Sequence, residues 1–233
     1  MKVSCTLSSS APFFAQGDFD HWWTRQGEWV EEANQRRGGS SGVQILPALV
    51  EGGPLLYSKR QTGHLYRSLR HPRGRPTILR ELDAYQALAG LGIRVPVLVF
   101  AGARHQQGEW QALLVTEALT GFVSLDQWYA THPDALLRSR VIAQTASMLA
   151  SLHRARWQHG CCYPKHIFVR TGTDTRNEEV VEVALLDLEK CRRRWRPASA
   201  AARDMDQLSR RWQTLPAADL QSLKAQHQAL LAD

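Results

Sequence analysis

The sequence predicts an α+β fold, with strands concentrated in the N-terminal half and helices in the C-terminal half. Short apolar runs separated by Gly-rich turns occupy residues 36–60, which is typical of an antiparallel β-meander. From Ile78 onward, apolar residues recur at every third or fourth position, which indicates a helix. Beyond residue 118, most of the chain has helical periodicity around a single β-hairpin. The strand-rich part therefore precedes the helical part.

Length and composition fit one medium domain or two small lobes. The chain has 233 residues, of which 43% are hydrophobic and 22% charged, so wholesale disorder and collagen-like or coiled-coil fibres are excluded. Its 29 Lys and Arg residues exceed its 22 Asp and Glu residues, giving a formal net charge of +7. A basic protein favours an anionic partner, which leaves nucleotide phosphates, nucleic acid, and an anionic lipid or sugar.

Neither a membrane span nor a disulfide framework is expected. No run approaches the ~18 apolar residues that cross a bilayer, and the first residues lack the continuous apolar segment of a secretory signal. The four cysteines are irregularly spaced, and the adjacent Cys161 and Cys162 lack the spacer of a zinc knuckle. We therefore expect a reduced, cytoplasmic protein.

Local patterns predict the N-terminal elements. Residues 13–33 are aromatic-rich and amphipathic, which predicts a helix or strand that packs against a neighbouring element. Its packing residues are expected to be the tryptophans Trp22, Trp23 and Trp29. The breaker cluster RRGGSSG at 36–42 precedes two strands, VQILPALV and LLYSKR. The basic segment 63–76 carries Pro and Gly late, and predicts a loop that contains a helical turn.

The middle and C-terminal elements follow in order. The helix that starts at Ile78 is expected to stop near Gly90, and strands follow at 95–102 and 110–119. A short helix with Ser124 as its cap precedes a long helix over about 134–157. The loop HGCCYPKH then leads into the strand IFVRT, a polar turn and the strand VVEVALLDLE. A basic cluster, CRRRWR, and two further helices complete the order.

Three ionisable residues stand at suggestive places in this order. Lys59 ends a strand, Glu81 lies in the first turns of the next helix, and Asp187 ends the apolar run ALLD. Each alone has an ordinary explanation as an edge, helix-dipole or turn residue. Together with a loop after a long helix, however, they follow the order of the parts that perform protein-kinase-type phosphoryl transfer.

The stretches LHRARWQHGCCYPKHIFV and LLDLEKC carry a more specific signal. With them, the chain from about Leu55 to Leu208 resembles the bacterial lipopolysaccharide core heptose kinases and their small relatives, the WaaP/InaA group. The resemblance implies a minimal protein-kinase-like bilobal fold, with an N-lobe over 1–117 and a helical C-lobe over 118–233. Because 46 residues follow Asp187, a shortened C-lobe is expected.

The resemblance also implies roles for individual residues. Lys59 would contact the α- and β-phosphates of ATP, and Glu81 would hold that lysine in place. His159 corresponds to the His of the family's catalytic loop. His166 and Asp187 would hold Mg²⁺.

Further roles concern the ends of the expected nucleotide site. Glu117 falls where the hinge meets the adenine, so its backbone is expected to bind. Gly38 and Gly39 are placed like a glycine-rich phosphate loop, although the regular glycine spacing is missing. Asp204 resembles an aspartate that ties the catalytic loop to a C-lobe helix.

One departure from the family concerns the catalytic Asp, which falls on Cys161 here, while the neighbouring Arg falls on Gly160. A neutral thiol is a poor substitute for the carboxylate that accepts a hydroxyl proton. Two interpretations stay open. Phosphoryl transfer has a loose transition state, so positioning by Lys and metal can sustain activity without the base; alternatively, the protein is a nucleotide-binding pseudokinase or stress-response regulator.

The leading hypothesis is ATP- and Mg²⁺-dependent phosphorylation of a sugar hydroxyl, with a lipopolysaccharide core sugar as the acceptor that the family implies. The cluster at 191–196 either cradles this anionic acceptor or is a solvated basic face. A second basic loop, comprising Arg67, Arg70, Arg73 and Arg75, could attract anionic lipid at the inner membrane. Nucleic-acid binding ranks last, because the sequence has no recognisable nucleic-acid-binding motif.

Overall fold

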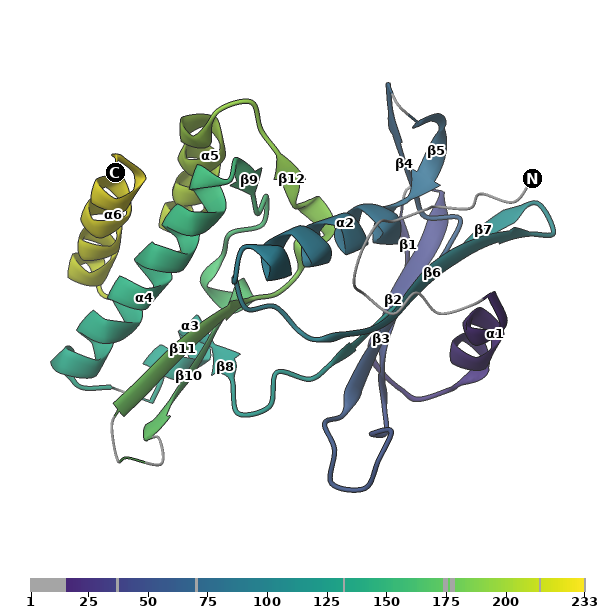
Figure 1. Cartoon of the computed structure of the whole chain (residues 1–233), viewed down its shortest axis with the longest axis horizontal. Helices are drawn as coiled ribbons and strands as arrows, with labels where there is room; N and C mark the ends of the chain where they lie inside the picture. The colour runs from purple at the N-terminus through teal and green to yellow at the C-terminus, as the bar shows by residue number, and fades with distance from the viewer. Residues whose placement is uncertain are drawn as a thin grey trace.

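The computed structural model describes residues 16–36, 38–69, 71–131, 133–173, 176, 179–213 and 215–232. An antiparallel five-stranded sheet near the N-terminus is followed by a largely helical part (Figure 1). In spatial order the sheet consists of β1 (Glu28–Arg36), β2 (Gly39–Leu46), β3 (Leu56–Thr62), β7 (Glu109–Glu117) and β6 (Leu98–Gln106). The antiparallel meander predicted over residues 36–60 is thus confirmed by β2 and β3.

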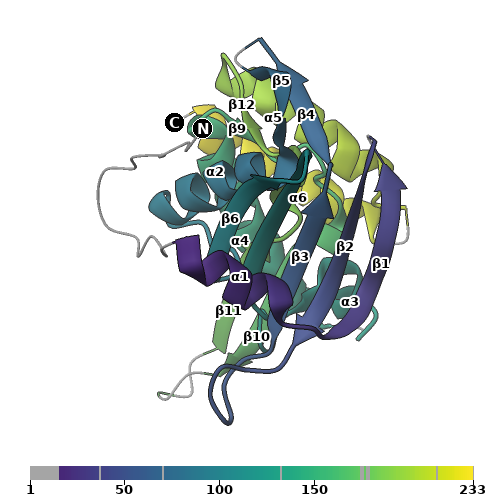
Figure 2. The same cartoon turned by 90° about the vertical axis from the view of Figure 1, so that its right-hand side faces the viewer.

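The sheet is covered on both faces. Helix α1 (Gln16–Thr24) lies across one face (Figure 2), and helix α2 (Thr77–Gly90) packs on the other. Strand β7 shows the period of two that this requires: Leu113 and Val115 belong to the cluster under α1, whereas Ala112 and Leu114 join the main core. Because β7 is buried on both faces, its sequence contains the continuous apolar run ALLV.

The tryptophans predicted to pack divide between core and surface. Trp22 is buried with Phe19 against Phe100, and Trp23 is partly buried beside them. Trp29, on β1, is 46% exposed. The aromatic N-terminal segment is therefore a helix followed by a strand, and the helix supplies the packing.

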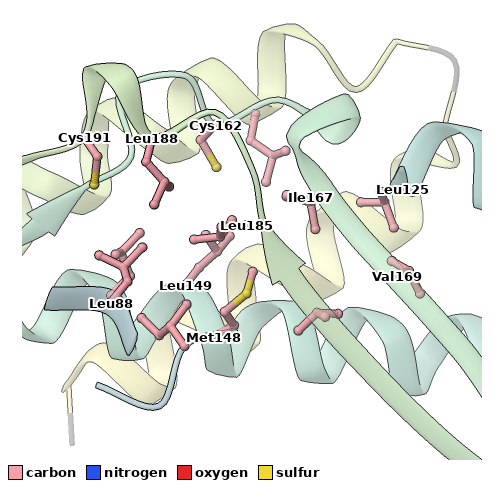
Figure 3. Close-up of a cluster of buried hydrophobic side chains, with 14 of the residues drawn as sticks. Leu88, Leu125, Met148, Leu149, Cys162, Ile167, Val169, Leu185, Leu188 and Cys191 are labelled. Atoms are coloured by element: carbon pink, nitrogen blue, oxygen red, sulfur yellow. The ribbon is translucent and has the colours of Figure 1, made fainter. Parts of the chain in front are cut away.

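The helical part surrounds a second, smaller sheet. Its elements are β8 (Val123–Ser124), α3 (Leu125–Tyr129), α4 (Ala135–Arg154), β9 (Trp157–Gln158), η1 (Pro164–His166), β10 (Ile167–Thr173), β11 (Glu179–Leu185), η2 (Leu188–Lys190), β12 (Arg192–Arg193), α5 (Pro197–Arg210) and α6 (Ala217–Ala232). Helix α4 packs against both α6 and β11. Figure 3 shows that Met148 and Leu149 of α4 meet Leu185 of β11 and Leu188 of η2 in one buried cluster.

Two predicted elements need correction. Residues 63–76 form a hairpin of β4 (Leu65–Ser68) and β5 (His71–Pro76), so the helical turn predicted there was wrong. Pro72 and Pro76 lack the backbone N–H that a helix interior requires, whereas they are compatible with an exposed two-stranded ribbon. The long helix ends at Arg154, three residues earlier than predicted, because Arg156 adopts a left-handed conformation with φ 64°.

No helix in the described part of the chain is long and apolar enough to cross a membrane.

Candidate active site

A cavity of about 810 Å³ lies between the N-terminal sheet and the helical part. Strands β1, β2, β3 and β7 and helix α2 supply one wall, and the loops before β10 and after β11 supply the other. Its lining includes six of the predicted residues: Lys59, Glu81, Glu117, Cys161, His166 and Asp187. These residues span more than half of the sequence, so the fold brings them together.

Lys59 lies in the middle of the sheet and points at α2. Its Nζ is 2.8 Å from Glu81 Oε2 and 3.0 Å from Glu189 Oε2. Burial lowers the pKa of Lys59, but the two carboxylates outweigh this and raise it above its ordinary value. Lys59 is therefore a fixed cation on the wall of the cavity.

Glu189 is the functional residue that the sequence analysis missed. It lies in η2, two residues after Asp187, and its carboxylate shares Lys59 with Glu81. Its backbone carbonyl accepts hydrogen bonds from Arg80 Nε and Nη2, at 2.9 and 2.6 Å. Adjacent residues of α2, Arg80 and Glu81, thus join the sheet to the segment that carries Asp187.

Asp187 has the left-handed conformation, with φ 62° and ψ 64°. This backbone is costly for a residue with a Cβ, and such strain concentrates at functional sites. The conformation ends the extended chain after β11 and starts η2, and the Asp187 side chain lines the cavity.

His166 faces Asp187 across the cavity floor. The Nδ1 atom of His166 is 2.8 Å from the carbonyl oxygen of Cys161, which can only accept, so Nδ1 carries a proton. In the neutral imidazole, Nε2 then carries the lone pair, and this atom lies 3.6 Å from Asp187 Oδ2. One nitrogen and one carboxylate oxygen, both possible ligands of a cation, therefore lie near each other at the cavity floor.

The loop 159–166 is held from below by Asp204 of α5. Asp204 Oδ2 accepts from His159 N at 2.6 Å, and Oδ1 accepts from Gly160 N at 2.9 Å. Gly160 has φ 80°, and a Cβ at this position would lie 2.7 Å from the Lys190 carbonyl oxygen. Only glycine allows this close approach, so an arginine could not replace Gly160 without moving the loop.

His159 itself does not line the cavity. Its Nε2 donates to the Leu186 carbonyl at 2.9 Å, and its Nδ1 accepts from Cys161 N at 3.2 Å. Burial lowers the pKa of His159, and a neutral imidazole satisfies both contacts. These contacts join the loop to Leu186, the residue before Asp187. His159 therefore helps to fix the position of the loop relative to Asp187.

A second pair of histidines extends this network to α6. His153 Nε2 is 3.1 Å from Asp204 Oδ2, and His153 Nδ1 is 2.8 Å from His227 Nε2. All three side chains are buried. The sequence analysis did not single out His227, because an isolated histidine in a helix carries no spacing signal.

Cys161, which the resemblance predicted at the position of the catalytic Asp, is buried and lines the cavity. Burial and the nearby Asp187 raise the pKa of its thiol, whose ordinary value already lies above neutral pH. The side chain is therefore a protonated thiol at neutral pH and cannot accept a proton as a carboxylate does.

The residues predicted to meet the adenine and to form the phosphate loop lie at opposite ends of the sheet. Glu117 is the last residue of β7, and Gly39 is the first residue of β2. The N–H of Glu117 already donates to the Val97 carbonyl at 2.9 Å. Leu119, two residues further on, also lines the cavity, so this end of β7 presents the backbone of the predicted hinge to the cavity. Gly38 and Gly39 form the turn between β1 and β2, beside Gly63 and outside the cavity lining.

Comparison with known proteins places the chain in a family. The sequence pattern of the Lipopolysaccharide kinase (Kdo/WaaP) family matches residues 20–232. The protein belongs to this Kdo/WaaP family. InaA of Escherichia coli (strain K12) is 42% identical over 217 residues, which cover 91% of this chain and 96% of InaA. The family expected from the sequence is therefore confirmed.

More distant members of the group show the fold. The lipopolysaccharide core heptose(I) kinase WaaP of the same strain is 28% identical over 128 residues, which cover 50% of this chain and 48% of WaaP. The structure of WaaP in complex with acyl carrier protein aligns with a TM-score of 0.66, at 19% identity, over 91% of this chain and 82% of that one. A Rio2 kinase complex from Chaetomium thermophilum aligns with a TM-score of 0.50 at 13% identity, over 88% and 62%. The protein-kinase-like α+β fold is thus confirmed.

The buried histidine pair predicts how folding stability depends on pH. Burial and the neighbouring His153 lower the pKa of His227 to about 4, whereas an unfolded histidine titrates near 6.5. Between these values the unfolded chain binds more protons, so the free energy of unfolding should fall by up to about 2–3 kcal/mol as the pH drops from 7 to 4.

Chemical denaturation across this pH range tests the prediction with two variants. His227→Gln keeps a nitrogen toward His153 but removes the titration, so its pH dependence should be shallower than that of the wild type. His105→Gln removes an exposed imidazole of β6 as the control. Equal slopes for His227→Gln and the wild type would contradict the assignment.

Proposed function

We propose that the protein binds ATP with Mg²⁺ in this cavity and transfers the γ-phosphoryl group to a sugar hydroxyl. The observation that supports it is the convergence of Lys59, paired with Glu81 at 2.8 Å, and Asp187 on opposite walls of one cleft. A fixed ammonium suits the phosphates of a nucleotide, and a carboxylate suits the metal ion that accompanies them. Membership of a lipopolysaccharide kinase family is consistent with this chemistry.

The residues at the cavity floor fit a magnesium ion. Mg²⁺ usually takes one or two protein carboxylates and completes its shell with phosphate oxygens and water. Asp187 would supply the carboxylate, and the Nε2 lone pair of His166 faces the same space at 3.6 Å from Asp187 Oδ2. Phosphate oxygens of the nucleotide and water would supply the remaining ligands. When bound, the ion would neutralise charge on the transferring phosphoryl group.

In this scheme each residue of the chain has a positioning or electrostatic role. Lys59 binds phosphate oxygens, and Glu81 holds the ammonium at the right place. Asp204 and His159 fix the 159–166 loop through its backbone, so the acceptor hydroxyl meets a preformed surface. The hinge at Glu117 and Leu119 offers its backbone to the adenine.

Cys161 gives specific support to a second candidate function. A buried thiol with a raised pKa does not accept a proton from the acceptor hydroxyl, and Glu189 forms an ion pair with Lys59 that competes with phosphate binding. In favour of the first candidate, phosphoryl transfer through a loose transition state depends little on a general base, so slow transfer is expected without one. The second candidate is a nucleotide-binding regulatory protein without turnover.

The acceptor is proposed from the family alone. WaaP is a core heptose kinase, and this chain aligns with about half of WaaP at 28% identity. We infer a sugar hydroxyl of a lipopolysaccharide core as the acceptor, and the cytoplasm as the compartment that supplies ATP. Three buried free cysteines are compatible with a reducing compartment.

The first prediction concerns nucleotide binding. ATP with Mg²⁺ at about a hundred times its dissociation constant should stabilise the wild type by about 2.7 kcal/mol, which raises Tm by several degrees. Lys59→Ala and Asp187→Ala should lose most of this shift, while Lys224→Ala, on the exposed face of α6, should keep it. Equal shifts in all four proteins, or none in the wild type, would overturn the proposed site.

The second prediction concerns Glu189. Its carboxylate competes with phosphate for Lys59, so Glu189→Gln should bind ATP five- to tenfold more tightly, a gain of about 1 kcal/mol. Isothermal titration calorimetry measures the change, with the exposed Glu109→Gln as the control. Weaker binding by Glu189→Gln would show instead that Glu189 helps to hold the nucleotide complex.

The third prediction separates the two candidate functions. Cys161→Asp should raise ATP-dependent phosphorylation of core oligosaccharide by a factor of about 10² or more, because it restores a general base. Cys161→Ser should match the wild type, since neither side chain is a base. Tight ATP binding without turnover in any of the three proteins would favour the regulatory function, and a loss of activity in Cys161→Ser would show that the thiol participates.

A further inference from the structure

Two segments carry the positive charge of this protein. Residues 63–76 and 190–203 together contain ten Lys and Arg side chains and no Asp or Glu. The remaining residues have 19 basic against 22 acidic side chains, a formal charge of −3. The excess that makes the whole chain basic is therefore confined to these two segments.

Both segments project from the same side of the molecule. The first contains the β4–β5 hairpin, and the second contains β12 and the turn into α5. Figures 1 and 2 are related by a rotation about the vertical axis, and in both views the hairpin and this turn reach the upper edge. A flat surface approaching from that side would meet both.

Each segment carries a large apolar side chain that is bare to solvent. Leu69, between β4 and β5, is 103% exposed, and Trp195, between β12 and α5, is 95% exposed. The next most exposed large hydrophobic residue in the described part is Val50, at 68%. One such residue needs no explanation, but two at the ends of adjacent basic projections indicate a contact surface.

Four exposed arginines flank these side chains in the part of the chain that the structure describes. Arg67, Arg73, Arg193 and Arg196 are exposed, and none of them forms an ion pair within the described residues. Arg75, farther from the tip of the hairpin, does pair with Asp83, at 2.8 Å. The charges nearest the projecting ends are thus the ones left for an external anion.

The second segment also carries internal repulsion. Burial and the neighbouring Arg194 and Arg203 lower the pKa of Arg192. A cluster of like charges destabilises the free protein, and an anionic surface that binds it would remove that cost. This observation supports a ligand for the cluster rather than a merely solvated face.

We propose that this basic face, comprising Leu69, Trp195 and the exposed arginines Arg67, Arg73, Arg193 and Arg196, docks on an anionic lipid bilayer. The arginines attract phosphate headgroups, and the indole of Trp195 suits the interface between headgroups and acyl chains. Transfer of the Leu69 side chain from water is favourable only into an apolar phase, such as the acyl-chain region of a bilayer. A nucleic acid would use the arginines but would offer the aliphatic side chain nothing, so the bilayer fits the whole face.

The basic face borders the cleft on both of its walls. Residues 63–76 lead directly into α2, which carries Glu81, and 190–203 follow η2 and Asp187. The docked protein would hold its cleft close to the headgroup layer, where a hydroxyl on a lipid-linked sugar could reach it. That consequence rests on the proposed function, whereas the docking itself does not.

Sedimentation with lipid vesicles, using the full chain without nucleotide, tests the docking. The wild type should bind vesicles of phosphatidylcholine mixed with phosphatidylglycerol, and should bind pure phosphatidylcholine vesicles far more weakly. Raising the salt concentration should weaken the binding, because screening shortens the reach of the arginines.

Two double variants separate the apolar and the charged contributions. Leu69→Ser/Trp195→Ser should lower the apparent affinity about tenfold, while Val50→Ser/Leu136→Ser, at exposed sites on other loops and helices, should not. Arg193→Glu/Arg196→Glu should abolish binding. Arg140→Glu/Lys224→Glu, with the same change of net charge on α4 and α6, should retain most of it.

Three results would overturn the proposal. They are an absence of binding to anionic vesicles at low salt, wild-type binding by Leu69→Ser/Trp195→Ser, and tighter binding to a DNA or RNA duplex than to anionic vesicles. All the substituted side chains in the test variants are exposed, and circular dichroism checks that they fold. Because the vesicle assay contains no ATP, its outcome does not depend on whether the protein binds nucleotide. A failure to bind vesicles would likewise leave the proposed nucleotide site untouched.

Discussion

The salt bridge between Lys59 and Glu81 is the constraint on which the cleft depends, because it joins the sheet to α2 where both charges are largely out of water. A buried charge without a partner is expensive, so neither side chain can leave without a penalty. With Glu81 fixed, the adjacent Arg80 reaches the Glu189 carbonyl and places η2 against α2. One ion pair therefore sets the distance between the two walls that hold Lys59 and Asp187.

The loop 159–166 separates positioning from proton chemistry. Asp204, His159 and the backbone at Gly160 hold the loop through buried hydrogen bonds that do not involve the side chain at 161. The position of the loop therefore does not depend on the Cys161 side chain. In the proposed function, orientation of the acceptor by this loop is separate from turnover, which would depend on that one residue.

Much of this arrangement could be predicted from the sequence, because order along the chain determines it. Lys59 lies on a recognisable strand, Glu81 lies on a recognisable helix and Asp187 follows a strand, and their succession predicted one cleft. Glu189 and His227 could not be found this way: neither has a spacing signal, and their importance arises from contacts across 130 and 74 residues. The hairpin at 63–76 was missed because its prolines and glycine are typical of loops, while cross-strand pairing, which decides the outcome, is not visible in local composition.

The contact between His153 and His227 has a consequence for biosynthesis. The network that secures the 159–166 loop reaches α6, and His227 is synthesised after every other residue that contributes to the cleft. While a ribosome still encloses α6, His153 lacks this partner and the loop lacks part of its support. The cleft therefore gains this part of its support only after α6 has been synthesised and has left the ribosome.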